Sequence, residues 1–186
     1  MTETDEAIYL RYTVTENSAD LEALLARHRD GLLLFLFSFV HSNEDAEELL
    51  IDTFARLAVD KPPFHPRRAG SFRSWLYAIG RNNALMMIRR GKVRTVPIHE
   101  GIPDSDDLPE TALLKNEGSR LLYQAMKELK PEYRRALTLL YFDGLSHDEI
   151  ALAMGMSKRQ IYSILKHGKE TLKKTLERKG ISDAQY

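Results

Sequence analysis

Basic and polar side chains recur at helical spacing in the last third of the chain, where they suit the binding of a polyanion. From Ser157 the sequence reads SKRQIYSILKHGK, and its polar residues fall on one side of a predicted helix. Such a set fits phosphates and base edges in a DNA major groove. The expected DNA contacts are Lys158, Arg159, Tyr162, Ser163, Lys166, His167 and Lys169.

The charge distribution indicates a second polyanion-binding surface. The 186 residues include 27 Lys and Arg and 27 Asp and Glu, so the net charge is zero. Residues 61–98, however, carry nine basic and no acidic residues, and residues 151–180 have a net charge of +6. Because neutralisation of phosphates supplies most non-specific affinity for nucleic acid, two such segments favour two DNA-facing surfaces. Two solvated helix faces are the alternative.

The remaining chemistry-bearing residues do not form an enzyme site. The chain has no Cys and shows no HExxH, GxGxxG or GxxxxGK pattern. Lone core or surface positions account for the histidines. We therefore expect no catalytic residue, no metal site and no cofactor. The six histidines are His28, His41, His65, His99, His147 and His167.

The elements that must position these residues are helices, so the predicted fold class is all-α. Apolar residues at helical period predict helices over 21–40, from Ser42, over 71–90, over 117–129 and over 131–142, with a compact pair from Ser146. The first is a core helix with a possible interruption at Gly31. The buried faces of the next two comprise Ala46, Leu49, Leu50, Thr53, Phe54 and Leu57, and then Phe72, Trp75, Leu76, Ile79 and Met86.

The last pair of helices has the pattern of a helix-turn-helix. Two capping boxes, Ser146 with Glu149 and Ser157 with Gln160, begin helices 11 residues apart. Small or apolar residues stand where the two helices cross and turn. A plain helical hairpin is the alternative. The crossing residues are Ala151, Gly155, Ile161 and Ile164, with Ile150, Leu152, Leu165 and Leu172 as further core; at Gly168 the helix either frays or approaches something closely.

A Pro-, Gly- and Asp-rich stretch separates the two basic regions. Residues 91–117 contain three prolines, two internal glycines and several aspartates, with no helical period before about Thr111. We therefore predict two small helical domains, 1–92 and 117–186, joined by a flexible acidic linker over 93–116.

Three strings resemble bacterial RNA polymerase sigma factors of the extracytoplasmic-function (ECF) group. YFDGLSHDEIALAMGMSKRQIYSILKHGKETLKK is similar to the fourth domain, which reads the minus-35 element. EDAEELLIDTFARL and GSFRSWLYAIGRNNALMMIRR resemble the second domain, which binds polymerase and melts the minus-10 element. The likeness runs from about Asp20 to Lys179. It implies a sigma factor that binds core RNA polymerase and directs promoter-specific initiation, rather than an enzyme.

The resemblance also implies roles for individual residues. Asn82 falls near the place of a captured minus-10 base, while Phe72 and Trp75 read better as core. Lys61, Arg67 and Arg68 are either solubilising charges or strand contacts, and Asp104, Asp106 and Asp107 either mimic nucleic acid or form a polar tether. The implied minus-10 set is Arg73, Arg81, Asn82, Asn83, Arg89 and Arg90, and the implied polymerase-binding set is Glu44, Asp45, Glu47, Glu48, Asp52 and Arg56.

The implied partners are core RNA polymerase, promoter DNA and an anti-sigma factor. We expect a cytoplasmic protein without membrane insertion, because the N-terminus MTETDEAIYL is acidic and no apolar run approaches a bilayer span. Tyr162, Ile164, Gly168, Met86 and Met87 depart from the family pattern and put promoter sequence and minus-35 phosphate contacts in question. A stand-alone helix-turn-helix regulator is the competing function, but it has no use for the helix at 71–90.

Overall fold

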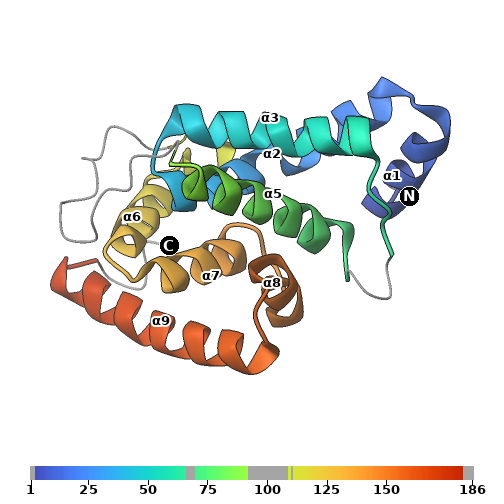
Figure 1. Ribbon diagram of the computed structural model, residues 1–186. Coiled ribbons are helices and arrows are strands. Elements are labelled where there is room, and N and C mark those ends of the chain that lie inside the picture. Colours follow the sequence, from blue (N-terminus) through green and yellow to red (C-terminus); the bar gives the residue numbers. More distant parts are fainter. Residues whose placement is uncertain (1–2, 66–69, 92–108, 110, 182–186) are drawn as a thin grey trace.

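The computed structural model describes residues 3–65, 70–91, 109 and 111–181, and every regular element within them is helical. Figure 1 shows α2, α3 and α5 in one half of the molecule and α6 to α9 in the other, consistent with the all-α prediction. The elements are α1 (Asp5–Thr15), α2 (Ser18–Val40), α3 (Asn43–Asp60), α5 (Phe72–Arg89), the 3-10 turn η1 (Ala112–Leu114), α6 (Glu117–Lys127), α7 (Pro131–Tyr141), α8 (His147–Met154) and α9 (Lys158–Arg178).

Helix starts are fixed by polar caps that the sequence supplies. The side chains of Ser42, Ser71, Ser146 and Ser157 each accept a hydrogen bond from a backbone N–H in the first turn of the following helix. These bonds satisfy donors that have no partner inside the helix. Both predicted capping boxes, at Ser146 and Ser157, are present. The starts of α3, α5, α8 and α9 therefore agree with the sequence analysis.

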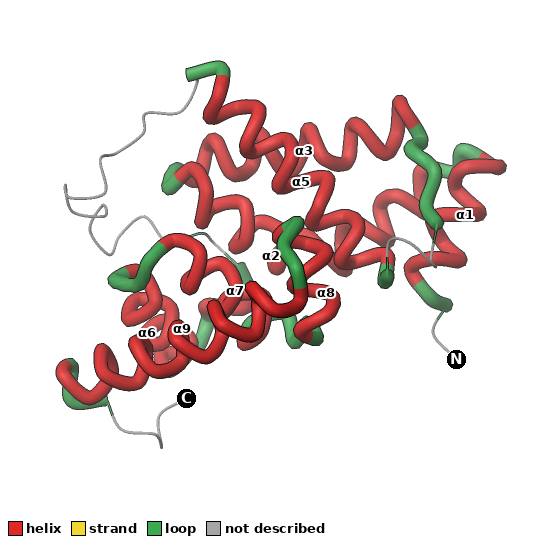
Figure 2. Tube along the Cα trace, turned by 60° about the horizontal axis from the view of Figure 1, so that its bottom comes forward, coloured by secondary structure: helices red, strands yellow, loops and turns green. Residues whose placement is uncertain are grey.

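Helix α2 lies at the centre of the molecule. Every residue from Gly31 to Val40 is buried, and the helix contacts α1, α3, α5 and α7. It crosses α5 closely, because a Cβ on Gly80 would lie only 3.1 Å from Leu32 and 3.3 Å from Leu36. Figure 2 shows the same central position of α2 from another direction. Gly31 does not interrupt this helix, so the expected break there is wrong.

Helix α1, which the sequence analysis did not predict, holds the start of α5. The backbone N–H of Phe72 donates to the Glu6 carboxylate at 2.9 Å, and Tyr9 packs on both Phe72 and Trp75 with ring centroids 5.4 and 5.1 Å apart. A carboxylate is favourable at this position because a helix N-terminus carries partial positive charge. The core reading of Phe72 and Trp75 agrees with this packing.

Two predicted core positions are wrong. Met86 is 43% exposed, and its neighbour Met87 is buried instead. Leu152 is 39% exposed, and its side chain lies against Gly70. Met86 lines the open groove between α3 and α5, and Leu152 meets a loop residue from a distant part of the sequence; helical period alone locates neither contact.

Candidate DNA- and polymerase-binding site

Helices α8 and α9 form the predicted helix-turn-helix, and α9 presents its polar face to solvent. All seven predicted minus-35 residues are exposed, with Tyr162 at 57%. The opposite face of α9 is buried through Ile161, Leu165 and Leu172. The arrangement fits the expected recognition helix, because the predicted DNA-binding side chains lie on its solvent-exposed face while its apolar face fixes it to the domain.

Short contacts order part of this exposed face. Lys158 pairs with Asp148 at 2.6 Å, and the rings of His147 and Tyr162 meet edge to face at 4.8 Å. Gly155 ends α8 with φ of +62°, a backbone conformation that glycine adopts without strain. These contacts link α8 to the start of α9.

Gly168 is explained by close approach and not by fraying. Helix α9 continues past it to Arg178, and Gly168 is buried. A Cβ at this position would lie 3.3 Å from both Leu137 and Tyr133 of α7. The missing side chain therefore lets the recognition helix pack tightly on its support.

The predicted minus-10 residues on α5 divide between two faces. Asn82, Arg89 and Arg90 are exposed, and Asn83 donates a hydrogen bond to the Thr53 hydroxyl at 3.2 Å. Arg73 and Arg81 instead turn toward the C-terminal half of the molecule. Burial lowers the pKa of Arg81. The structure thus does not bring the six residues together on one surface.

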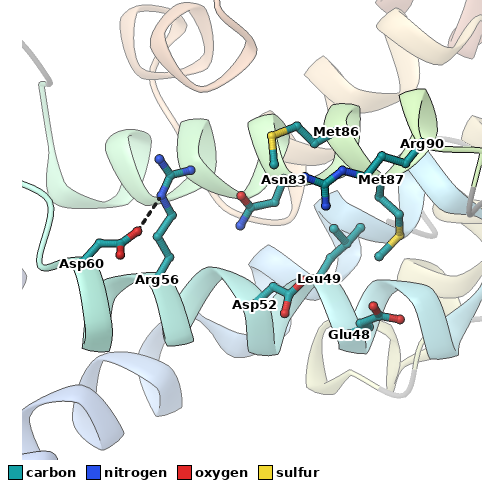
Figure 3. A pocket seen from close by; sticks show the side chains of 9 residues that line it. All are labelled: Glu48, Leu49, Asp52, Arg56, Asp60, Asn83, Met86, Met87 and Arg90. Atoms are coloured by element: carbon teal, nitrogen blue, oxygen red, sulfur yellow. Dashed lines mark ion pairs between the residues drawn. The ribbon is translucent and has the colours of Figure 1, made fainter.

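An open groove of about 400 Å³ runs between α3 and α5 (Figure 3). One wall carries charged residues of α3, and the other carries amide, thioether and guanidinium groups of α5. Arg56 and Asp60 form an ion pair along the α3 wall at 3.6 Å. The lining residues are Glu48, Leu49, Asp52, Arg56, Asp60, Asn83, Met86, Met87 and Arg90. The groove joins part of the predicted polymerase set to part of the predicted minus-10 set.

The predicted polymerase-binding residues lie on two sides of α3. Glu44, Glu48, Asp52 and Arg56 are exposed at intervals of four and form one stripe. Glu47 faces α2 and pairs with Arg29 at 3.6 Å, while the backbone N–H of Asp45 donates to the Ser42 cap. Asp60 extends the stripe to the end of the helix, and sequence analysis missed it although the same spacing of four residues would have identified it.

Some of the predicted residues lie outside the part of the chain that the structure describes, and others were predicted not to form a metal site or a membrane span. Arg67, Arg68, Asp104, Asp106, Asp107 and most of the linker lie outside the described residues, and Lys61 pairs with Glu16. Within the ranges described, no group of three His, Asp or Glu side chains is placed to hold a metal ion. None of the helices in this part of the chain combines the length and apolar character needed to cross a bilayer.

Two family models match the sequence, one in its N-terminal half and one in its C-terminal half. Sigma-70 region 2 matches residues 24–94, and Sigma-70, region 4 matches residues 119–172. The ECF RNA polymerase sigma factor SigE of Mycolicibacterium smegmatis is 29% identical over 168 residues, which are 88% of this chain and 64% of that relative. RNA polymerase sigma factor YlaC of Bacillus subtilis is 29% identical over 160 residues, 84% of this chain and 91% of YlaC.

Two solved structures share the fold. One is CnrH in complex with the cytosolic domain of CnrY, with a TM-score of 0.66 and 21% identity over 95% of this chain and 99% of CnrH. The other is the sigma factor RpoE in complex with the anti-sigma factor NepR from Bartonella quintana. Its TM-score is 0.60, and it is 23% identical, with coverage of 85% of this chain and 97% of the matched chain. Together with the paired region matches, the helix-turn-helix and the acidic α3, these findings show that the chain belongs to the ECF-type RNA polymerase sigma factors, the non-catalytic subunits that direct promoter recognition and transcription initiation.

Proposed function

We propose that the chain divides promoter recognition between its two domains, 1–92 and 117–186, with 93–116 as the connecting linker. The observation that carries this assignment is the set of seven exposed polar residues on α9, held by two capped helices. In this assignment α9 reads the minus-35 duplex through the major groove, and Lys158, Arg159, Tyr162, Ser163, Lys166, His167 and Lys169 make the contacts.

In the same proposal α5 handles the minus-10 element. Asn82 is exposed beside Arg81, whose Nη2 donates to the Asn82 amide oxygen at 3.0 Å. An amide can recognise the edge of an unstacked base, and Arg89 and Arg90 are free to neutralise the strand that carries it. Arg73, Arg81 and Asn83 complete the set, with Arg73 and Arg81 available only when the C-terminal domain moves away.

The exposed stripe on α3 is the proposed polymerase-binding surface. Four carboxylates and Arg56 follow one another at helical spacing from Glu44 to Asp60. Such a stripe suits a basic partner surface and raises the rate at which the two meet. Glu47 and Asp45 are peripheral to the stripe in this arrangement.

We further assign the protein to the cytoplasm and to control by an anti-sigma factor. Support for the anti-sigma factor comes from a solved structure of the same fold, in which RpoE is bound to the anti-sigma factor NepR. Core RNA polymerase and promoter DNA are then the productive partners, and the anti-sigma factor competes with them.

Two single variants test the division of labour. In holoenzyme assembled with core polymerase, Arg159→Ala is expected to weaken binding of the closed minus-35 duplex about tenfold, as for loss of one charge-assisted contact. Asn82→Ala is expected to leave that binding unchanged while permanganate-reactive open complexes decrease. Lys174→Ala, on the same helix as Arg159 but outside the predicted set, is the control. Equal open-complex formation by Asn82→Ala and wild type would remove Asn82 from the site.

A further inference from the structure

Asp143 is one of the residues through which the two halves of the molecule make contact. Helix α8 packs on α5 and α7 packs on α2, so the turn between α7 and α8 faces the N-terminal half. In that turn the Asp143 carboxylate accepts a hydrogen bond from the fully buried Tyr77 hydroxyl of α5. The Asp143 backbone carbonyl accepts a second bond from Arg73 Nη1 at 2.7 Å. Two residues of α5 thus hold one residue of the C-terminal half.

Gly31 is required by this contact. A Cβ on Gly31 would overlap the carboxylate and the Tyr77 hydroxyl, and it would lie 2.7 Å from Asp143 Cγ. Glycine within a helix is less favourable than alanine by about 1 kcal/mol. Glycine at position 31 therefore lowers the stability of helix α2, but it leaves the space that the Asp143 carboxylate occupies.

A second contact covers Arg81. Its guanidinium lies against Gly155 in the turn of the helix-turn-helix, so that a Cβ there would lie 2.6 Å from Arg81 Cζ. Among the described residues Arg81 Nε is buried and has no hydrogen-bond partner. At the start of α5, the Ser71 hydroxyl donates to the Glu149 carboxylate of α8 at 2.6 Å. Arg81 is therefore partly desolvated, and its side-chain partner is the Asn82 amide oxygen and not a neutralising carboxylate, which is unfavourable for a cation.

A third contact lies at the end of α2. The guanidinium of Arg135 on α7 stacks 3.8 Å from the Phe39 ring and donates to the Ser38 carbonyl at 3.4 Å. Arg134 Nη2 lies 3.3 Å from His41 Nε2. Cations at the C-terminus of a helix are favourable because the last carbonyls carry partial negative charge. The two halves thus also share polar contacts between α2 and α7.

We propose that this closed arrangement is a self-inhibited state of the sigma factor, latched by Tyr77 on Asp143 over Gly31. The inference rests on the proposed minus-10 role of Arg73 and Arg81. Neither guanidinium is free for DNA while Arg73 donates to the Asp143 carbonyl and Arg81 lies under Gly155. The α9 face remains exposed, so the closed state can meet a minus-35 duplex but lacks two of the cations for the melted strand. Opening of the interface releases both.

The balance between closed and open states is expected to respond to single changes. Opening breaks the hydrogen bond between the Tyr77 hydroxyl and Asp143, which is unfavourable. Opening also hydrates Arg81, which is favourable, so the two contributions to the free energy of opening oppose each other. Loss of one buried hydrogen bond to a charged group then shifts the closed-to-open ratio by about tenfold or more.

The distance between the two halves tests the latch directly. The chain has no cysteine, so Ala26→Cys on α2 and Thr171→Cys on α9 provide two unique, exposed positions for spin labels. In this labelled, full-length background, Tyr77→Phe removes the hydroxyl, and Gly31→Ala displaces Asp143 while favouring helix α2 itself. Each is expected to raise the open population about tenfold, with unchanged helix content by circular dichroism. Glu22→Gln, which removes the charge of an exposed carboxylate on α2, is the matched control. It is expected to change neither the open population nor the helix content.

Binding of a single-stranded minus-10 oligonucleotide by the free protein is the functional readout. We expect it to tighten in Tyr77→Phe and Gly31→Ala in proportion to the open population. Unchanged distance distributions in both variants would overturn the latch. Opening without tighter oligonucleotide binding would overturn the self-inhibition. A separate variant, Arg89→Ala, tests the proposed minus-10 site without altering the interface. If the proposed site is wrong, holoenzyme with Arg89→Ala would form as many open complexes as the wild-type holoenzyme does.

Discussion

Arginine and lysine side chains occupy two contrasting environments in this chain. Lys158, Arg159 and Lys166 on α9 are exposed, whereas Arg134 is buried and Arg81 is desolvated against Gly155. Exposed cations bind phosphate with little desolvation and are screened by salt. Buried cations instead depend on carbonyls, rings and neighbouring side chains. Charge alone thus locates the basic segments, but burial decides which of their cations are exposed in the closed arrangement.

Lys166 is expected to contribute one phosphate contact. Lys166→Ala should weaken promoter binding to a similar extent on all sequences and lower the slope of log K against log salt by about one. The measurement is a salt titration of holoenzyme on duplex promoter DNA. Lys174→Ala, which removes a cation from the same helix outside the predicted set, should leave the slope unchanged. A slope that Lys166→Ala does not alter would remove this residue from the phosphate contacts.

His41 is expected to make the stability of the closed arrangement dependent on pH. Burial, with the charges of Arg134, Arg135 and Lys127, lowers the pKa of His41 to about 4 from its usual 6.5. Between pH 6.5 and about pH 4, His41 is protonated in the unfolded chain but neutral in the folded chain. The free energy of unfolding should therefore fall as pH decreases from about 7 toward 4.

His41→Asn isolates this effect. His41 caps α2 in the left-handed conformation, with φ of 55°, which asparagine also tolerates. Urea unfolding at pH 7.5 and pH 5 should show a smaller loss of stability in the variant than in wild type. An equal loss in both proteins would assign the pH dependence to other groups.

At the scale of the elements, the caps of α8 and α9 set the direction of the recognition helix. Ser157→Ala removes the hydroxyl that accepts from the Gln160 N–H and should cost about 1 kcal/mol. For a chain of this size that corresponds to about 2–4 °C in Tm, measured by thermal denaturation. Ser157→Asp retains a capping oxygen and should lose much less. A Ser157→Ala protein as stable as wild type would show that tertiary packing alone fixes the start of α9.

Sequence patterns predicted elements better than contacts between them. Capping residues and the 3.6-residue period are local, so the starts of α3, α5, α8 and α9 were identified correctly. Gly31 and Leu152 were misread because their neighbours come from distant parts of the sequence: Asp143 and Tyr77 lie beside Gly31, and Gly70 lies beside Leu152. Helix α1 was missed although Thr4 caps it, because its apolar residues do not form one stripe: Ile8, Tyr9 and Tyr12 are buried, whereas Leu10 and Val14 are exposed. The latch at Asp143 had no local pattern at all.

At the scale of the whole molecule, two domains with separate proposed DNA roles pack against each other through polar and apolar contacts. The resemblance to sigma factors predicted both domains and their order, which the matches to residues 24–94 and 119–172 confirm. It also predicted the exposed face of α9. It did not predict that Arg73 and Arg81 face the other domain, since that depends on how the halves pack.

The central claim is that one chain, bound to core polymerase, selects promoters through two spaced elements. The most direct measurement is to isolate the complex with bacterial core RNA polymerase by size exclusion and to sequence run-off transcripts from fragmented genomic DNA. We predict start sites that share a minus-10 and a minus-35 element at fixed spacing. Tight operator binding by the protein alone, with no stable polymerase complex and no shared start-site elements, would contradict the account.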